Sequence, residues 1–265
     1  MISNYVSRFT SVLTLTALFG AGSLTAQAQT VFYDNTANFS GFAFSNGGAA
    51  AQGTAPAINT ITTLVADDIS LSDSRAVNIT SFEFTVSNLS TTAIKARPRV
   101  RFYLGDGANG GPGTLLTGFS FGGATGVGST FPARSVITLP EFTGNTSTLF
   151  TVPANSYFWA GVTFDNNTGA TGATAAQLNN LGQGLFDPPT IGNSVDAAFQ
   201  TTAAGSFLGN NPAGGLFNFG GSPIASFGWQ FTGIAQTPEP GAVATLLGFG
   251  VSGLALLRRR RSARK

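Results

Sequence analysis

The sequence predicts an all-β protein, a single β-sandwich or jelly-roll-like domain, with an apolar helical segment at each end. Three observations carry this prediction. Short runs of alternating aromatic and polar residues are separated by turns rich in Gly, Asn and Pro, a pattern typical of sandwiches. The chain holds 24 Phe but only 9% charged residues, which favours a packed core over disorder. Two further apolar segments stand apart from the alternating region, one near each end.

The first apolar segment has the composition of a secretory leader. Arg8 precedes the apolar residues 12–19, and small residues then lead to Ala26-Gln27-Ala28. A basic residue, a short apolar helix and an A-x-A site are the three parts of a signal peptide. We therefore expect a signal peptide over residues 1–28, export through the translocase and cleavage by signal peptidase after Ala28. A buried N-terminal helix is the alternative.

The middle of the chain predicts several strands joined by turns. In residues 80–87, Phe82, Phe84 and Val86 share one face while Glu83 and Thr85 point outward. Strands with one apolar face require two sheets packed face to face. The segments expected to be strands are, in order, 31–33, 80–87, 100–104, 135–139, 148–152, 157–164 and 225–232.

One β-domain is expected over residues 29–234, with residues 235–240 as a linker. The Gly-rich residues 105–113 predict a turn-dense loop, and residues 201–224 predict irregular structure. A short helix is expected at most over residues 173–181. Trp229 lies in an alternating apolar set and is expected in the core.

The second apolar segment has the composition of a membrane span. Residues 241–257 carry no charge and would reach about 25 Å as a helix, near the lower limit for crossing a bilayer. The basic tail, residues 258–265, begins with Arg258, Arg259, Arg260 and Arg261 and is expected on the cytoplasmic side. Pro238, Glu239 and Pro240 precede the span and favour an extended, protruding backbone. A buried core helix is the alternative.

In this order, the motif, the short apolar helix and the basic cluster resemble a PEP-CTERM sorting signal. The resemblance covers residues 237–265. It implies that an exosortase-like membrane enzyme recognises the tail and cuts near Pro238-Glu239-Pro240. It also implies a protein anchored transiently in the inner membrane and then delivered to the cell surface or the extracellular matrix. The chain would be the substrate of that enzyme and not itself a catalyst.

A second resemblance concerns the exported region. The motifs Tyr33-Asp34-Asn35-Thr36 and Gly110-Gly111-Pro112-Gly113, the second after the strand 100–104, look like those of bacterial choice-of-anchor surface domains. The segment 151–162, with Tyr157 and Trp159, belongs to the same likeness, which covers about residues 31–232. It implies a secreted β-domain and supplies no catalytic residues.

The charge of the exported region differs from that of the whole chain. Seven of the 13 Lys and Arg and one of the 11 acids lie in the leader and the tail, which leaves six cations and ten acids, a net charge of about −4. A nucleic-acid partner is therefore not expected. The local basic cluster of Lys95, Arg97, Arg99 and Arg101 would share one strand face, with Val100, Phe102 and Leu104 opposite. We expect a solvated face there, with a site for an anionic polysaccharide as the alternative.

Composition also limits the chemistry of the exported region. The chain has no Cys and no His, which excludes thiol nucleophiles, Ser-His-Asp triads and His-ligated metals. We therefore expect no enzyme and no cofactor. Glycoside hydrolysis by two carboxylates remains an alternative. The acids available to it are Asp34, Asp67, Asp68, Asp73, Glu83, Asp106, Glu141, Asp165, Asp187 and Asp196.

Two loops carry oxygen ligands of the kind that calcium prefers. Asp106 with Asn109 forms one candidate, and Asp165 with Asn166 and Asn167 forms the other. Neither matches an EF-hand loop, and turn stabilisation by Asp and Asn is the alternative at each.

Tyr157 and Trp159 lie on the less apolar face of their predicted strand and are candidate sugar platforms. The alternative is that both rings are buried. The sequence thus predicts an exported structural or adhesive protein of an exopolysaccharide layer or biofilm, or alternatively a carbohydrate-binding module for extracellular polysaccharide.

Overall fold

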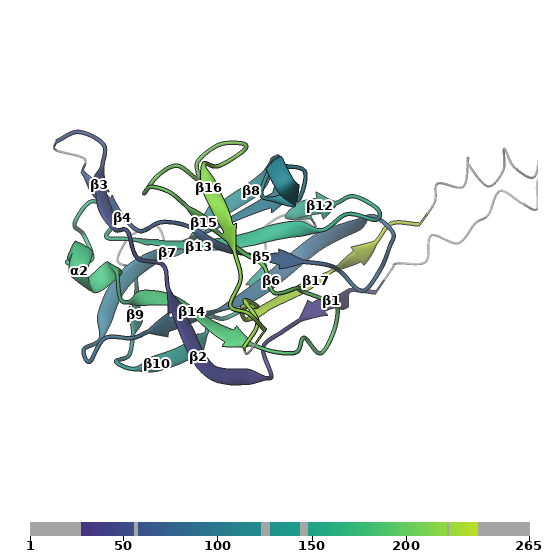
Figure 1. Cartoon of the computed structure of the whole chain (residues 1–265), viewed down its shortest axis with the longest axis horizontal. Coiled ribbons are helices and arrows are strands. Elements are labelled where there is room, and N and C mark those ends of the chain that lie inside the picture. The colour runs from purple at the N-terminus through teal and green to yellow at the C-terminus, as the bar shows by residue number, and fades with distance from the viewer. Residues whose placement is uncertain (1–27, 56–57, 123–127, 144–147, 222, 238–265) are drawn as a thin grey trace, which may run out of the picture.

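The protein is built from two antiparallel β-sheets with almost no helix (Figure 1). The computed structural model describes residues 28–55, 58–122, 128–143, 148–221 and 223–237. Helical turns within these residues are limited to α2 (Ala175–Leu178) and the 3-10 helix η1 (Ala108–Gly110). The all-β class expected from the sequence is therefore confirmed.

The first sheet is organised around the long strand β6. Its neighbours along the sheet follow the order β1, β17, β6, β14, β2, and three short strands also pair with β6. The bounds are β1 (Thr30–Asp34), β17 (Trp229–Ala235), β6 (Val77–Asn88), β14 (Leu181–Phe186), β2 (Phe39–Ser45), β10 (Ser135–Thr138), β11 (Phe142–Thr143) and β12 (Phe150–Val152).

The second sheet is organised around β13, which lies between β5 and β7. Its order is β16, β15, β5, β13, β4, β3, with β7 also paired to β8 and β9. The bounds are β16 (Gly214–Phe217), β15 (Ala198–Thr201), β5 (Val65–Ile69), β13 (Phe158–Asp165), β4 (Asn59–Ile61), β3 (Ala50–Gln52), β7 (Ile94–Leu104), β8 (Leu115–Ser120) and β9 (Ser129–Phe131).

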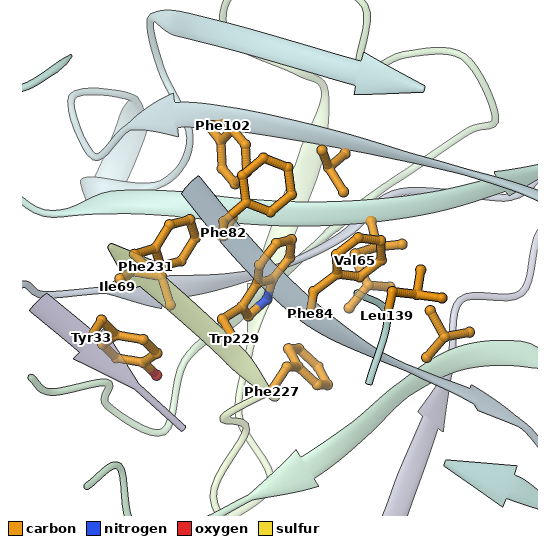
Figure 2. Packing of buried hydrophobic residues seen from close by; sticks show 14 of the residues in the cluster. Tyr33, Val65, Ile69, Phe82, Phe84, Phe102, Leu139, Phe227, Trp229 and Phe231 are labelled. Atoms are coloured by element: carbon orange, nitrogen blue, oxygen red, sulfur yellow. The ribbon is translucent and has the colours of Figure 1, made fainter. Parts of the chain in front are cut away.

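An aromatic core joins the two sheets (Figure 2). The ring of Phe82 in β6 lies 5.0 Å from that of Phe102 in β7, and Phe158 in β13 lies 5.0 Å from Phe231 in β17, measured between centroids. Trp229 is fully buried, as expected from the sequence. Because each strand contributes one apolar face, the rings interlock between the sheets and exclude water.

The first and last strands of the described chain are neighbours in the first sheet. β1 and β17 are antiparallel neighbours, and Thr30 pairs with Gly233. The first and last described residues therefore leave one edge of the first sheet side by side (Figure 1). Within the described residues, strand pairing forms two sheets that pack around one hydrophobic core.

Several local expectations need correction. Residues 65–69 were not expected as a strand, yet they form β5 in the middle of the second sheet. The helix expected over residues 173–181 is limited to α2, and Leu181 already begins β14. The strand expected over 225–232 begins only at Trp229, and the region 201–224, expected to be irregular, contains β16.

Apart from Ala28, the expected leader over residues 1–28 and the expected span over 241–257 lie outside the described residues. Within the part of the chain that the structure does describe, no helix is both long enough and apolar enough to cross a membrane.

Candidate functional site

The candidate site lies on the outer face of the second sheet, the face turned away from the main core. Strand register places Asp68 of β5, Trp159 of β13 and Tyr103 of β7 side by side in one row. Partners in register share a face, so all three side chains project outward from the sheet. Trp159 and Tyr103 belong to a small second core that also contains Phe207. This row is the floor of the site.

The Gly-rich loop after β7 lies against Trp159, the middle residue of this row. The Tyr157 hydroxyl and the Trp159 Nε1–H both donate to the carbonyl oxygen of Gly110, at 2.7 and 2.9 Å. A Cβ atom at Gly105 would lie 2.3 Å from the Tyr157 ring, and one at Gly110, where φ is +77°, would lie 2.6 Å from its hydroxyl. Glycine at both positions therefore lets the loop lie directly against the aromatic pair.

A second loop, between β15 and β16, is tied to the first. The Leu115 backbone N–H donates to the Asn210 Oδ1 at 2.8 Å, and the Asn211 N–H donates to the Gly113 carbonyl oxygen at 2.8 Å. The Tyr103 hydroxyl donates to the carbonyl oxygen of Phe207 from below. These bonds hold two loops that are distant in sequence as one wall.

Three adjoining hollows lie along these loops, and we call them together the outer groove. The central hollow, of about 350 Å³, is lined by Asp68, Asn109, Tyr157, Trp159 and Leu216 among others. A hollow of about 590 Å³ shares Asn109 and Leu216 with it, and one of about 250 Å³ shares Tyr157 and also contains Asp106. Each of the other two hollows thus adjoins the central one.

The electrostatics of the groove are set by Asp68. Its residue is 5% exposed, and burial raises the pKa of its carboxyl group to about 6. The Val195 backbone N–H, at 3.2 Å from Oδ1, and the Ser194 hydroxyl, at 3.4 Å, donate to it and oppose this rise. Near neutral pH the carboxylate is therefore ionised at the floor of the central hollow.

The two predicted sugar platforms both line the central hollow, with different exposure. Tyr157 is half-buried, and its ring lies between the central and the smallest hollow. Trp159 is only 2% exposed, because Phe199 and the Gly110 loop cover it. The structure leaves Tyr157 as the ring that a ligand can reach, while Trp159 serves as its support.

The residues of the two calcium candidates are engaged with the protein itself. Both oxygens of Asp106 accept hydrogen bonds from Thr114, from its N–H and its hydroxyl, each at 2.7 Å. Asn109 lies in η1 with a φ of 54° and faces the groove. Asp106 therefore stabilises its own loop, whereas Asn109 lines the groove. Among the described residues, no three or more acids gather as a metal site.

Asp165, in the second calcium candidate, is also bound by other groups of the protein. It is fully buried and accepts from Arg97 at 2.9 Å, from Arg99, and from the N–H of Asn167 at 2.7 Å. The Arg97 Nε and the Asp165 carboxylate meet because the two residues are in register across β7 and β13. The carboxylate is balanced by two guanidinium groups.

This arrangement also corrects the expected solvated basic face. The Arg97 and Arg99 side chains are only 21% and 18% exposed. Arg101 lies under the loop after β15, with its guanidinium carbon 5.8 Å from the centre of the Phe207 ring. Lys95 is half-buried on the same face of β7. The cluster is thus part of the packing of the outer face.

Sequence reasoning missed Asp68 and Gly110 as site residues. Asp68 was named only among the ten acids available for hydrolysis, although the apolar flanks of Val65-Ala66-Asp67-Asp68-Ile69 are a signal for a buried strand. Gly110 contributes a backbone carbonyl, for which the sequence gives no signal.

The sorting residues Pro238, Glu239, Pro240 and Arg258–Arg261, and Ala26 of the leader site, lie outside the described residues. Comparison of the chain with models of known families, with curated proteins and with solved structures finds no match.

Proposed function

We propose that this chain is an exported bacterial surface or matrix protein that binds an extracellular polysaccharide in the outer groove. The leader and the PEP-CTERM-like tail support the export and sorting part of the proposal. The observation that carries the binding part is Tyr157, a partly buried aromatic residue that lines two adjoining hollows and donates its hydroxyl to the Gly110 carbonyl oxygen.

The shape and lining of the groove suit a chain of sugars. Sugar rings present apolar C–H faces and polar rims, so a protein holds them with an aromatic face and nearby polar groups. Tyr157 supplies the aromatic face, while Asn109 and Asp68 supply polar groups in the same hollow. The two adjoining hollows give room for more than one sugar unit. A compact ligand would need only the central one.

Glycoside hydrolysis is the second candidate, and one observation favours it. Burial raises the pKa of Asp68, whereas hydrogen bonds from Thr114 lower the pKa of Asp106, and Tyr157 lies beside both hollows. Carboxyl groups with pKa values moved apart can serve as acid and base. Binding is favoured because both oxygens of Asp106 already accept hydrogen bonds from Thr114.

The test is binding of the full chain, in detergent micelles, to a panel of bacterial matrix polysaccharides measured by titration calorimetry. We expect binding that Tyr157→Ala weakens about tenfold, the effect of losing one stacked ring. Phe42→Ala is the matched control, because Phe42 is a 60% exposed ring on β2 of the other sheet. Release of new reducing ends in the same mixtures would assign hydrolysis instead.

Failure to bind any polysaccharide would overturn the proposal. Equal losses for Tyr157→Ala and Phe42→Ala would move the binding site away from the groove.

A further inference from the structure

The outer groove has an acidic lining that no cation balances. Asp68 and Asp106 line its hollows, and no Lys or Arg of the described residues does so. The Lys and Arg of the described residues are engaged or placed elsewhere: Arg97 and Arg99 bind Asp165, Arg75 binds Asp73, and Arg101 lies over Phe207. Lys95 belongs to the half-buried face of β7, and Arg134 lies in the turn before β10. The groove is therefore negative near neutral pH.

Asp68 is the group that makes this charge available to a ligand. Its charged and titratable neighbours are Asp67 on the same strand, Tyr33 on β1 and Tyr157 beside the hollow. None of these groups is a cation, so the part of the chain that the structure describes supplies hydrogen bonds to the carboxylate but no countercharge. A desolvated carboxylate without a countercharge attracts a cation from outside more strongly than one in water.

The central hollow combines this carboxylate with aromatic rings. Tyr157 and Trp159 line it together with Asp68, and Asn109 and Ser70 add polar atoms. An aromatic surface beside a carboxylate is the arrangement that proteins use for ammonium groups, because the ring faces and the carboxylate both carry negative potential. We propose that the glycan of the outer groove bears free amino groups, and that one hexosamine ammonium occupies the central hollow over Asp68.

This inference rests on the proposed function and narrows its ligand. A polysaccharide rich in uronic acids would bring carboxylates against Asp68 and Asp106, which costs free energy at short range. An N-acetylated polymer would offer no charge to Asp68. A lysine side chain of a protein would satisfy the charge alone, but a groove of three adjoining hollows fits a repeating chain of rings better.

The experiment compares two oligosaccharides of equal length, one of β-1,4-linked glucosamine and one of N-acetylglucosamine, on the full chain in detergent micelles. Near neutral pH we expect the glucosamine oligomer to bind about tenfold more tightly, the effect of one charge-assisted contact. Its affinity should fall as the pH falls through about 6, where Asp68 takes up a proton.

Asp68→Asn keeps the size of the side chain and an acceptor for the Val195 N–H, and should abolish the preference without abolishing binding. Glu83→Gln removes the same charge from β6 of the first sheet and should leave the preference intact.

Equal or tighter binding of the acetylated oligomer by the unmodified chain would overturn the inference and leave the proposed function standing. The same holds if a neutral or an acidic polysaccharide is the only one bound. Binding of a lysine-rich peptide but of no glycan would overturn both. Because the first comparison uses the unmodified chain, it decides the question even if Asp68→Asn fails to fold.

Discussion

Asp67 and Asp68 are adjacent in sequence but face opposite sides of β5. Asp67 is fully buried on the inner side, where its carboxylate accepts from the Phe227 N–H at 2.7 Å and from the Ser194 hydroxyl at 3.0 Å. Burial raises the pKa of Asp67 well above its ordinary value, and the charge of Asp68 raises it further. Burial of the Tyr33 hydroxyl, together with the charge of Asp67, raises the pKa of Tyr33. The two carboxylates therefore lie on opposite sides of β5, that of Asp68 at the groove and that of Asp67 in the interior.

The pKa of Asp67 has a consequence for stability. A raised pKa means that the folded protein binds the proton more tightly than the unfolded chain does. The contribution of Asp67 to the free energy of unfolding is therefore fully present below pH 3.8, the ordinary pKa of Asp. It is lost as the pH rises through the raised pKa.

We expect Asp67→Asn to lose less stability than the unmodified protein between acid and neutral pH, because the amide cannot ionise. It should have little effect in acid. Urea unfolding of both proteins at the two pH values measures this. Unfolding curves that respond identically to pH would contradict the assignment of the charge to Asp67.

Asp165 is predicted to matter more for stability than any exposed acid. Asp165→Asn leaves Arg97 and Arg99 half-buried without their countercharge, and should cost about 3 kcal/mol. Asp73→Asn is the control, because Asp73 pairs with an Arg75 side chain that is 50% exposed, and loss of this pair should change stability little. Chemical denaturation of both variants provides the comparison, and equal midpoints would refute a special role for Asp165.

Strands with clear alternation could be predicted from the sequence, whereas strands defined by their neighbours could not. β6 and β13 contain alternating Phe residues, so their inner faces were evident. β5 carries two Asp side chains and is a strand because β13 and β15 pair with it on both sides. Pairing between distant segments overrides local strand preference, and the pairing partners cannot be recognised from a single sequence.

At the scale of elements, the core between β6 and β7 predicts the cost of removing one ring. Phe82→Ala should destabilise the protein by about 3–5 kcal/mol, because the ring is 1% exposed and packs against Phe102 and Phe142. Phe42→Ala, at an exposed ring of the edge strand β2, should change stability by no more than about 0.5 kcal/mol. Thermal or urea unfolding measures both, and a small loss for Phe82→Ala would contradict the packing described.

The candidate site shows the same limit of sequence reasoning. Tyr157 and Trp159 could be proposed from alternation within one strand. The row of Asp68, Trp159 and Tyr103 depends on the register of three strands, and the Gly110 carbonyl depends on how a loop lies over them. Neither is a local property of the sequence.

At the scale of the whole molecule, the two chain ends and the groove belong to different layers. The first and last described residues lie next to β1 and β17 of the first sheet, and the outer groove lies on the outer face of the second. Under the proposed function, a tail that leaves the first sheet keeps the groove free for the matrix.

The proposed sorting predicts the mature C-terminus. Mass spectrometry of the protein from its native cells should find a chain that ends near Pro238-Glu239-Pro240, because the enzyme implied by the tail cuts close to that motif. A mature chain that still ends at Lys265 would rule out this processing.

Hydrogen exchange of the full chain, with and without the matrix polysaccharide that binds it, tests most directly the claim that the outer groove is the binding site. We expect slower exchange in residues 105–116 and 209–216 and around Tyr157, because ligand contact hinders opening of those loops. Residues 39–45 of β2 should exchange unchanged. Protection confined to β2, or none at the groove despite saturating ligand, would contradict the claim.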